Sequence, residues 1–428
     1  MEQKIAPAGR LRGVIRLPGD KSISHRYALL AAIAEGESRI HNYATGADCR
    51  STLGAVEALG VRVKRDGTTI TIDGAGMEGL SRPLEELDAG NSGSTIRMLC
   101  GILAAQRFDS KIGGDESLSK RPMDRIMVPL AKMGADIEAR AGRFPPLHIH
   151  GRPLEAIRYE PPVASAQVKT CVLLAGLFAP GETTVAEKTM TRDHTELALR
   201  EFGAEVRSAK GEITVRGPAR LRGCELTAPG DLSSGAFFLA AAMLAPGSEL
   251  FLQGVGLNPT RSALLDWLAV GGARIRVVNI AQSHGELAGD LEVRHAPFRG
   301  GVIEKGMTAA LIDEIPVLAV LGAASSEGLV VRDAAELRVK ETDRIAAVAE
   351  NLRRMGVAVE TTGDGFRVPG RQKFHAATLD SFGDHRIAMA FAVAALAADG
   401  ECIIDGAEAA SVSFPGFYDT LLQAAGRE

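Results

Sequence analysis

The sequence has few of the features that mark disulfide-bonded, zinc-binding or membrane-spanning chains. Its five cysteines form no C-x-x-C pair and stand far apart, at Cys49, Cys100, Cys171, Cys224 and Cys402. This spacing argues against a disulfide scaffold or a structural zinc site, and it fits a reducing cytosol. The longest apolar run, residues 387–398, is shorter than the ~18 residues that cross a bilayer. The opening residues MEQKIAPAGRLRG lack the apolar segment of a signal peptide, so we expect a soluble, cytoplasmic protein.

The chain also lacks an excess of positive charge and several common catalytic motifs. Its formal net charge of −4 argues against a general nucleic-acid binder. It contains no G-x-x-x-x-G-K-[ST], H-E-x-x-H or G-x-S-x-G motif, and its nine histidines show no metal-ligand spacing. We therefore expect no metal and no organic cofactor. The many cations and few clustered acids favour a phosphorylated, carboxylated small molecule handled by electrostatics and acid–base chemistry.

A pattern of about seventy residues repeats along the chain. With 428 residues, 46% of them hydrophobic, and 48 glycines, the composition suits an α/β protein of two domains. A helix-like segment, a glycine and an alternating hairpin recur, with the glycine at Gly60, Gly134, Gly203, Gly272 and Gly356. A sixth helix-like segment reaches Gly426 without a following hairpin. The sequence therefore predicts six units.

Each unit is also expected to contain one helix that is apolar on nearly every side. The six segments follow polar or glycine-rich turns and cover residues 17–32, 88–105, 161–177, 228–244, 311–324 and 382–398. Because such a helix has no face suited to water, we predict that all six lie inside a domain. Each begins near Ser, Asn or Asp, which are the residue types that cap helix N-termini.

The first and fourth units share the letters PGD. These stand at Pro18–Asp20 and Pro229–Asp231, 211 residues apart, which is about half the chain. The spacing indicates a duplicated half, and hence three units in each domain. The unfinished sixth unit predicts that an N-terminal strand, at about residues 4–17, completes the C-terminal domain. We therefore predict one domain over 20–230 and an interleaved domain over 1–19 plus 231–428.

The starts of the buried helices are the predicted binding site. Their unpaired N–H groups and the positive end of the helix dipole attract anions. Polar side chains gather there: Lys21, Ser22 and Arg26; Asn91, Ser94 and Arg97; Ser165, Gln167 and Lys169; Asp313 and Glu314; and Asp384, His385 and Arg386. We expect the six starts to converge on a cleft between the domains. Helix caps and solvated cations are the alternative explanation for any single turn.

Two further segments carry clustered charges. Residues 117–135 place Arg121 in a loop before a helix. Glu341 lies three residues before Arg344, so the two share a helical face, and Thr342 is a candidate cap of that helix. Alternating charges on a surface helix would explain the second segment equally well.

Nine short motifs are distributed along the chain. They read GDKSISHR, GNSGSTIR, KRPM, SAQVKT, TRDHTE, IDEIP, KETDRI, GDHRIAMA and SFPGF, and they span nearly the whole sequence. In this order they closely resemble the motifs of the EPSP synthase family of enolpyruvyl transferases. The resemblance implies an inverse α/β, barrel-like fold of two domains, each with three β-α-β-α-β-β units. It also implies transfer of the enolpyruvyl group of phosphoenolpyruvate to the 5-hydroxyl of shikimate 3-phosphate, with release of phosphate and without a cofactor.

The resemblance implies roles for individual residues. Contacts to shikimate 3-phosphate are expected from Lys21, Ser22, Arg26, Ser165, Ala166, Gln167, Arg192, Asp313 and Lys340. Contacts to phosphoenolpyruvate are expected from Lys21, Gly93, Arg121, Gln167, Arg344 and Arg386. Asp313 and Glu341 are the implied acid–base pair, with Lys21 as a further catalytic residue. The domain over 20–230 would mainly bind shikimate 3-phosphate, with the active site in the cleft between the domains of a monomer.

These roles agree with the chemistry of the implied reaction. Phosphoenolpyruvate carries a phosphate and a carboxylate, and planar arginine side chains bind both groups bidentately. The reaction needs a proton delivered to the methylene carbon and a base for the 5-hydroxyl, followed by loss of phosphate as a proton is removed. Two carboxyl groups held among cations can exchange these roles, and domain closure would exclude water.

The chain departs from the family pattern at several positions. Val412 stands where some relatives carry a lysine, which removes one expected cation. Ser94 and Met98 stand where relatives often have Thr and Pro, so the neighbouring pocket is expected to differ in shape. Glu336 and Ala166 stand where some relatives have Asn and Ser, which weakens two polar contacts.

Two alternatives stay open at this point. A sibling enolpyruvyl transferase acts on UDP-N-acetylglucosamine and usually carries a nucleophilic cysteine after Gly-Gly, where this chain has Asp115. A non-catalytic anion-binding relative would share the fold, because fold does not fix function. Asp313 and Glu341 argue against that relative, since a protein that only binds anions has no use for acids beside its cations.

Overall fold

The computed structural model describes residues 1–426, and the chain divides into two compact units. The N-unit comprises Gly19–Ala228 together with Gln282–Glu286. The C-unit comprises Met1–Pro18, Pro229–Ala281 and the chain from Leu287 onward. Unlike the predicted division, the hairpin tip Gln282–Glu286 therefore groups with the N-unit. Within residues 1–426 no helix is both long and apolar enough to cross a membrane.

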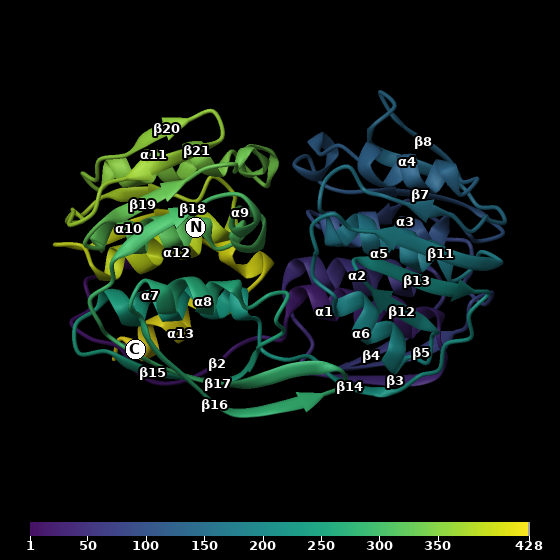
Figure 1. The fold of residues 1–428 in the computed structure, drawn as a ribbon, viewed down its shortest axis with the longest axis horizontal. Helices are drawn as coiled ribbons and strands as arrows, with labels where there is room; N and C mark the ends of the chain where they lie inside the picture. The colour runs from purple at the N-terminus through teal and green to yellow at the C-terminus, as the bar shows by residue number, and fades with distance from the viewer. Residues whose placement is uncertain (427–428) are drawn as a thin grey trace. The chain divides into compact units, whose positions relative to one another are not determined.

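The N-unit is an α/β unit with three four-stranded sheets, ordered β14-β3-β5-β4, β6-β7-β9-β8 and β10-β11-β13-β12 (Figure 1). Its helices are α1 (Lys21–Ile33), α2 (Ala47–Ala58), α3 (Gly93–Leu103), α4 (Asp124–Lys132), α5 (Ala166–Gly176) and α6 (His194–Glu201), with a 3-10 turn at Leu118–Lys120. Its strands are β3 (Glu35–His41), β4 (Arg62–Asp66), β5 (Thr69–Ala75), β6 (Leu87–Asp88), β7 (Asp109–Gly113), β8 (Asp136–Arg140), β9 (Phe144–His150), β10 (Arg158–Tyr159), β11 (Gly181–Ala186), β12 (Val206–Ala209), β13 (Glu212–Gly217) and β14 (Glu225–Thr227).

The C-unit repeats this architecture with sheets ordered β2-β15-β17-β16, β18-β19-β21-β20 and β1-β23-β22. Its helices are α7 (Leu232–Leu244), α8 (Ala263–Val270), α9 (Gly306–Leu311), α10 (Ile315–Ala324), α11 (Arg344–Arg354), α12 (His385–Leu396) and α13 (Phe417–Ala424), with 3-10 turns at Ala335–Val339 and Ala407–Val412. Its strands are β1 (Glu2–Ile5), β2 (Arg12–Arg16), β15 (Glu249–Gly256), β16 (Arg274–Ser283), β17 (Glu286–Arg294), β18 (Gly300–Ile303), β19 (Gly328–Val331), β20 (Glu360–Thr362), β21 (Gly365–Val368), β22 (Thr378–Asp380) and β23 (Cys402–Asp405).

In each repeat, an edge strand pairs in parallel with the next strand of its sheet. In four of the repeats, a buried helix lies in the connection between these two strands. Parallel neighbours need a long crossover, and the buried helices α3, α5, α10 and α12 lie in the crossovers of four sheets. The other two sheets obtain their parallel edge strand from the opposite half of the sequence. Strand β2 pairs with β15, and β14 pairs with β3. The first repeat therefore receives β14 from the middle of the chain, and the fourth repeat receives β2 from the N-terminal segment.

The single N-terminal strand expected at about residues 4–17 is in fact two strands in two different sheets. Strand β1 lies antiparallel to β23 and completes the sixth sheet, whereas β2 is the edge of the fourth. The sixth sheet has three strands, while the other five have four. Ile5 of β1 is fully buried, so the strand contributes to the core of the C-unit.

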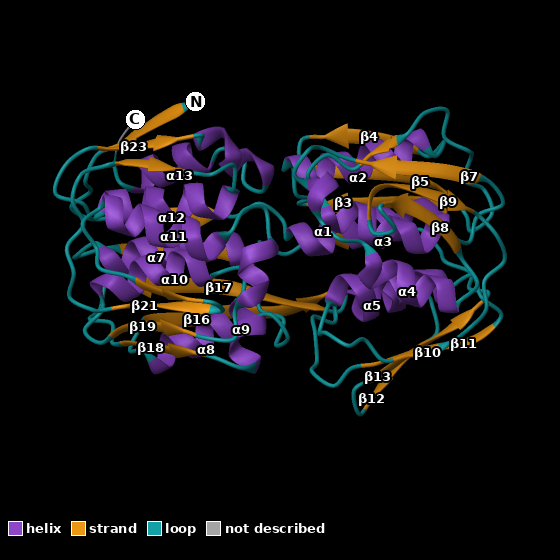
Figure 2. Cartoon of the chain, turned by 90° about the horizontal axis from the view of Figure 1, so that it is seen from above, coloured by secondary structure: helices purple, strands orange, loops and turns teal. Residues whose placement is uncertain are grey.

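The six apolar helices lie inside the two units, as the sequence predicts. Helices α1, α3 and α5 contribute to the core of the N-unit, and α7, α10 and α12 to that of the C-unit (Figure 2). Every residue of α12 is buried. Apolar side chains on all sides of these helices are therefore covered by other helices and by the sheets.

A glycine in the left-handed region follows each second helix of the six units. The φ angles are +89°, +88°, +85°, +96°, +75° and +70° at Gly60, Gly134, Gly203, Gly272, Gly356 and Gly426. Only glycine adopts this region without strain, and it commonly ends helices in this way. The regularly spaced glycines in the sequence therefore mark the end of the second helix in each of the six structural repeats.

Five of the six buried helices are capped by an Asp or Ser side chain. The cap residues are Asp20, Ser92, Ser165, Asp231 and Asp384. The exception is α10, where Glu314 occupies the cap position and Pro316 is in the first turn. In the charged helix α11 the cap is Asp343, which accepts from the backbone N–H of Ala346, so the expectation for Thr342 was one residue early.

Replacing either of two helical glycines of the N-unit with alanine should change the stability of the protein, in opposite directions at the two positions. A Cβ at Gly101 would lie 2.2 Å from the backbone oxygen of Cys171, because α3 and α5 pack closely there. A Cβ at Gly54, on the exposed side of α2, would meet nothing within 4 Å. Gly101→Ala should therefore lower the free energy of unfolding by ~2 kcal/mol, while Gly54→Ala should raise it by ~0.5–1 kcal/mol. Urea denaturation of both variants tests this, and equal effects would contradict the packing described.

Candidate functional site

Arg26 is a buried cation on α1 that is surrounded by oxygens of uncharged groups. Its Nε donates to Oγ1 of Thr195 at 2.7 Å, and its Nη2 donates to Oγ1 of Thr170 at 2.9 Å. Its Nη1 donates to the backbone oxygen of Ser22 at 2.7 Å. Burial, and then the nearby charge of Arg192, lower the pKa of Arg26 to about 10. The guanidinium is thus held in place without an ion pair to any carboxylate in residues 1–426.

Three other predicted residues lie at the same end of α1 or contact it. Arg192, in the loop before α6, donates from Nη1 to Oγ of Ser22 at 3.4 Å. Lys21 opens α1 and its Nζ lies 2.9 Å from Oδ2 of Asp48, at the start of α2. The two side chains of this ion pair are 18% and 11% exposed, so the pair is largely buried. The structure therefore brings Lys21, Ser22, Arg26 and Arg192 together in one cluster.

His25 is buried in the same stretch of α1 and contacts hydroxyl groups. Its Nδ1 lies 2.6 Å from Oγ1 of Thr52, which lies 2.7 Å from Oγ1 of Thr95 on α3. Burial, together with the charges of Lys21 and Arg26, holds the pKa of His25 well below its usual value. The imidazole is therefore neutral in the folded protein at neutral pH.

Gly93 is the first residue of α3 and lies against two arginines. A Cβ at this position would lie 2.8 Å from Nη1 of Arg97 and 3.6 Å from Nη1 of Arg121. The same Nη1 of Arg97 donates to Oε1 of Gln167 at 2.8 Å, and Nε2 of Gln167 donates to Oγ of Ser94 at 2.9 Å. Gly93, Arg121 and Gln167, which the sequence assigned to one substrate, thus lie around the starts of α3 and α5.

Arg121 is anchored by the turn that precedes α3. Its Nη2 donates to Oδ1 of Asn91 at 2.8 Å and to Oγ of Ser117 at 3.1 Å. Asp115 stabilises this turn, because its two carboxylate oxygens accept from Nδ2 of Asn91 and from the backbone N–H of Leu118, each at 2.8 Å. The side chain at position 115 therefore orders the loop that presents Arg121.

Ser165 and Ala166 form the start of α5. The hydroxyl of Ser165 accepts from the backbone N–H of Val168 at 3.4 Å, so it caps the helix. The carbonyl oxygen of Ala166 accepts from the hydroxyl of Thr170 at 2.7 Å. The cap and the threonine that holds Arg26 are therefore five residues apart at the start of one helix.

The C-unit carries a second cluster, in which the cations are paired with carboxylates. Arg344 begins α11 and is buried, and its Nε lies 2.7 Å from Oδ2 of Asp384, the cap of α12. Its Nη2 lies 2.7 Å from Oε2 of Glu341, and its Nη1 lies 3.7 Å from Oδ1 of Asp313. Burial alone would lower the pKa of Arg344, but the carboxylates of Asp384 and Glu341 outweigh burial and raise it. Arg344 therefore stays charged and orients two acids.

Arg386, in the first turn of α12, contacts Asp313, which also lies near Arg344. Its Nη1 donates to the backbone oxygen of Asp313 at 2.9 Å and to Oγ of Ser233 at 2.7 Å. The adjacent Glu314 is fully buried, and its Oε1 lies 2.6 Å from Nη2 of Arg261. Burial acts to raise the pKa of Glu314, but the charge and hydrogen bonds of Arg261, together with the charge of Arg386, outweigh burial and lower it. The Glu314–Arg261 pair therefore fixes the segment that carries Asp313.

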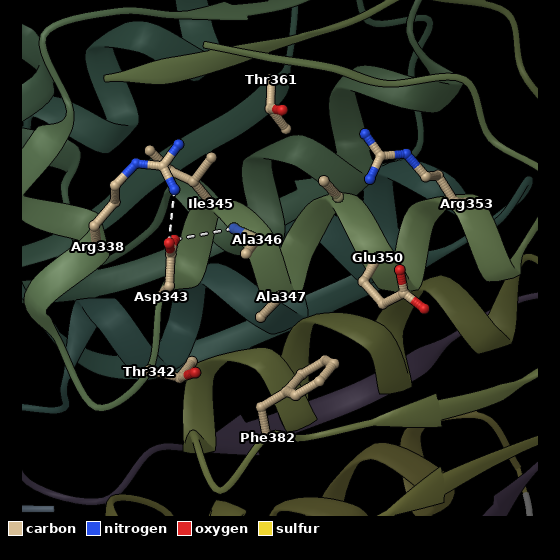
Figure 3. A pocket seen from close by; sticks show the side chains of 11 residues that line it. Arg338, Thr342, Asp343, Ile345, Ala346, Ala347, Glu350, Arg353, Thr361 and Phe382 are labelled. Atoms are coloured by element: carbon tan, nitrogen blue, oxygen red, sulfur yellow. Dashed lines mark hydrogen bonds and ion pairs between the residues drawn. The ribbon is translucent and has the colours of Figure 1, made fainter. Parts of the chain in front are cut away.

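The loop before α11 presents Lys340 and Glu341, and it is anchored by Arg338. The Nζ of Lys340 lies 3.8 Å from Oδ1 of Asp313. Arg338 donates from Nη1 to Oδ2 of Asp343 at 2.6 Å, as Figure 3 shows, and from Nε to the backbone oxygen of Gly363 at 2.7 Å. The loop is thus tied both to the cap of its helix and to the β20–β21 turn.

The cavity in Figure 3 lies on a different face of α11. Its volume is about 390 Å³, and it is lined by Ile345, Glu350 and Arg353, among others. The lining residues do not include Asp313, Lys340, Glu341, Arg344 or Arg386. The cavity is therefore separate from the cluster of cations and acids.

The sequence-predicted residues fall into one group in each unit. The N-unit holds Lys21, Ser22, Arg26, Gly93, Arg121, Ser165, Ala166, Gln167 and Arg192, and the C-unit holds Asp313, Lys340, Glu341, Arg344 and Arg386. Sequence reasoning missed Asp48, Thr170, Thr195 and Arg261. The two threonines stand in the motifs SAQVKT and TRDHTE, which was a usable signal, whereas no motif marks Asp48 or Arg261. Residues 1–426 contain no group of three His, Cys, Asp or Glu side chains placed to hold a metal ion.

Comparison with known proteins gives one consistent result. The family model described as "EPSP synthase (3-phosphoshikimate 1-carboxyvinyltransferase)" matches residues 5–421. A 3-phosphoshikimate 1-carboxyvinyltransferase of Solibacter usitatus is 64% identical over 98% of this chain and 99% of its own length. One of Koribacter versatilis is 53% identical over 98% of both chains. These matches cover nearly the full chain.

Two solved structures also match the fold. The EPSP synthase of Acinetobacter baumannii superposes with a TM-score of 0.88 at 40% identity, covering 99% of this chain and 98% of that one. The enolpyruvyl transferase NikO of Streptomyces tendae superposes with a TM-score of 0.81 at 21% identity, covering 98% and 96%. The second similarity is informative for the fold alone.

The buried, neutral His25 predicts a specific pH dependence of stability. Its pKa is depressed in the folded state, so the unfolded chain takes up a proton below pH ~6.5 that the folded chain does not. The stabilisation is present above that pH and is lost as the pH falls, by up to ~1.4 kcal/mol per pH unit. His25→Asn should flatten the fall in unfolding free energy between about pH 6.5 and 5. The exposed His148→Asn is the control, and equal slopes for His25→Asn and the wild type would contradict the prediction.

Proposed function

The chain belongs to the EPSP synthase (3-phosphoshikimate 1-carboxyvinyltransferase) family, and we propose which of its residues carry the reaction of that family. The enzyme transfers the carboxyvinyl group of phosphoenolpyruvate to the 5-hydroxyl of shikimate 3-phosphate and releases phosphate. The observation that carries the residue assignment is Arg26, a buried cation held by hydroxyls and a carbonyl rather than by a carboxylate. Such a cation is arranged to receive an anion, because burial makes its charge costly until an anion pairs with it.

The anionic groups of shikimate 3-phosphate are assigned mainly to the N-unit. Arg26 and Arg192 supply charge, and the hydroxyls of Ser22 and Ser165 supply hydrogen bonds at the starts of α1 and α5. The full proposed set is Lys21, Ser22, Arg26, Ser165, Ala166, Gln167 and Arg192, with Asp313 and Lys340 from the C-unit. Charge-assisted hydrogen bonds to oxyanions are among the strongest that proteins make, so these groups would dominate the affinity.

Phosphoenolpyruvate is assigned to arginines of both units. Arg121, with Lys21, Gly93 and Gln167, would bind it from the N-unit, and Arg344 and Arg386 from the C-unit. The absence of a side chain at Gly93 leaves room beside Arg121, which a Cβ there would narrow. Fixed arginines that face the phosphate and the carboxylate would stabilise the charge that develops as the phosphate leaves.

Glu341, Asp313 and Lys21 are proposed for the proton transfers. In the addition step a proton is delivered to the methylene carbon, and C2 takes the 5-hydroxyl oxygen as that hydroxyl loses its proton. In the elimination step a proton leaves the new methyl group and phosphate departs from C2. Glu341 and Asp313 are both oriented by Arg344, at 2.7 and 3.7 Å, so one cation holds an acid and a base in fixed positions.

The alternative substrate UDP-N-acetylglucosamine is not favoured. The full-length similarity is to 3-phosphoshikimate 1-carboxyvinyltransferases. Asp115, at the place of the sibling enzyme's cysteine, is engaged in ordering its loop through Asn91 and Leu118.

The five cysteines are free, which supports a cytoplasmic location. The monomeric state stays a prediction.

A phosphate-release assay tests the proposed substrates. Phosphoenolpyruvate with shikimate 3-phosphate should release phosphate in steady-state turnover, because both substrates meet their assigned cations. Phosphoenolpyruvate with UDP-N-acetylglucosamine should release none, and each substrate alone serves as a blank. Absence of release with shikimate 3-phosphate would overturn the proposal.

Two substitutions separate the proton-transfer role from the binding role. Glu341→Gln keeps a hydrogen-bonding side chain but removes the titratable group, so kcat should fall by ~10²–10⁴-fold with a small change in either KM. Arg26→Ala should instead raise the KM for shikimate 3-phosphate by at least about tenfold, since it removes a charged contact. Steady-state kinetics with each substrate varied measures both effects, and near-full turnover in Glu341→Gln would refute its acid–base role.

A further inference from the structure

Lys169 is a buried lysine on α5 that is paired with two carboxylates inside the N-unit. Its Nζ lies 2.7 Å from Oε1 of Glu196 and 3.0 Å from Oε2 of Glu187. The three side chains are only 1%, 3% and 5% exposed. Burial raises the pKa of Glu196, and the charge of Lys169 counteracts burial in part. A buried ionic cluster of this kind is costly to desolvate and is weak evidence for stability, so another reason for its presence is needed.

The cluster holds one neighbouring residue, Thr191, by several of its atoms. The backbone N–H of Thr191 donates to Oε2 of Glu187 at 3.4 Å, and its hydroxyl donates to Oε1 of the same carboxylate. The Nζ of Lys169 donates to the backbone oxygen of Thr191 at 3.5 Å. The backbone N–H, the backbone oxygen and the hydroxyl of Thr191 are therefore all hydrogen-bonded to Lys169 or Glu187.

Thr191 lies in a loop that has no helix or strand of its own. Residues 187–193 connect β11 to α6, and the loop is exposed around Thr191, with Met190 72% accessible. The next residue is Arg192, whose Nη1 reaches Oγ of Ser22 at the start of α1. Arg192 lies between Thr191 and Asp193, the cap position of α6. The anchor at Thr191 therefore fixes the backbone on the N-terminal side of Arg192, where the loop has no strand pairing.

We infer that Lys169 and Glu187 are positioning residues for Arg192, acting through Thr191. The inference rests on the proposed function, in which Arg192 binds shikimate 3-phosphate. Neither Lys169 nor Glu187 needs to touch the substrate for this role. The cluster holds the guanidinium of Arg192 near Ser22 before the substrate arrives, and pre-organised contacts of this kind raise affinity by lowering the ordering cost of binding.

Thr191→Val tests the inference with little change of shape. It removes the hydroxyl that donates to Glu187 and leaves Lys169 paired with both carboxylates. The KM for shikimate 3-phosphate should rise about tenfold, while the KM for phosphoenolpyruvate should change less than about twofold. Thr191→Ser restores a hydroxyl and should return the KM for shikimate 3-phosphate to within about twofold of the wild type.

Lys188→Met is the matched control for the loop. Lys188 is in the same segment but is 80% exposed and pairs with Glu160 on the surface. Its substitution should leave both KM values within about twofold of the wild type, because exposed ion pairs contribute little. Lys169→Met would leave two buried carboxylates without their cation and risks misfolding, so Thr191 carries the test.

Arg192→Ala separates this inference from the proposed function. A raised KM for shikimate 3-phosphate in Arg192→Ala beside an unchanged KM in Thr191→Val would overturn the positioning role alone. An unchanged KM in Arg192→Ala would remove the substrate role of Arg192, and the positioning inference with it. Equal increases of both KM values in Thr191→Val would show a general structural effect and would also overturn the inference. The selective increase, with rescue by Thr191→Ser, supports it.

Discussion

Six helices are buried inside two α/β units, and each must satisfy the N–H groups of its first turn away from bulk water. Five of them do so with an Asp or Ser cap. The sixth, α10, places Glu314 at the cap position and pairs it with Arg261. This constraint concentrates polar residues at the helix starts, and the cations and acids assigned to the reaction lie beside those caps. The apolar remainder of each helix supplies the rigidity that holds them in place.

The two buried arginines Arg26 and Arg344 are held by different kinds of group. In the N-unit, Arg26 is bonded to threonine hydroxyls and a carbonyl, and burial lowers its pKa to about 10. In the C-unit, Arg344 is equally buried but contacts Asp384 and Glu341, which raise its pKa. The first arrangement leaves a positive charge for a substrate anion. The second orients carboxylates beside a buried cation, which suits proton transfer.

Much of this was predictable from the sequence, because helix periodicity and left-handed glycines are local signals. The six repeats, the buried helices and the residues of the nine motifs follow from such signals. The sequence indicated that an N-terminal strand joins the C-terminal domain, but not that β2 pairs with β15 or that β14 pairs with β3, since a strand of three or five residues carries no record of its partner. Asp48 and Arg261 were missed for the same reason: each meets its partner, Lys21 or Glu314, across a long stretch of sequence. The cap of α11 was misplaced by one residue because Thr342 and Asp343 are both good caps.

We propose that Arg26 is retained to bind an anionic substrate, and that its buried charge lowers the stability of the free protein. Arg26→Met replaces the buried charge with an unbranched apolar side chain, and thermal unfolding measured with and without shikimate 3-phosphate tests this proposal. Without ligand, we expect an unfolding midpoint at or above that of the wild type, because a buried charge without a carboxylate partner is removed. We also expect that the increase produced by shikimate 3-phosphate is largely lost. A lower midpoint without ligand, together with an undiminished increase on ligand addition, would contradict the proposal.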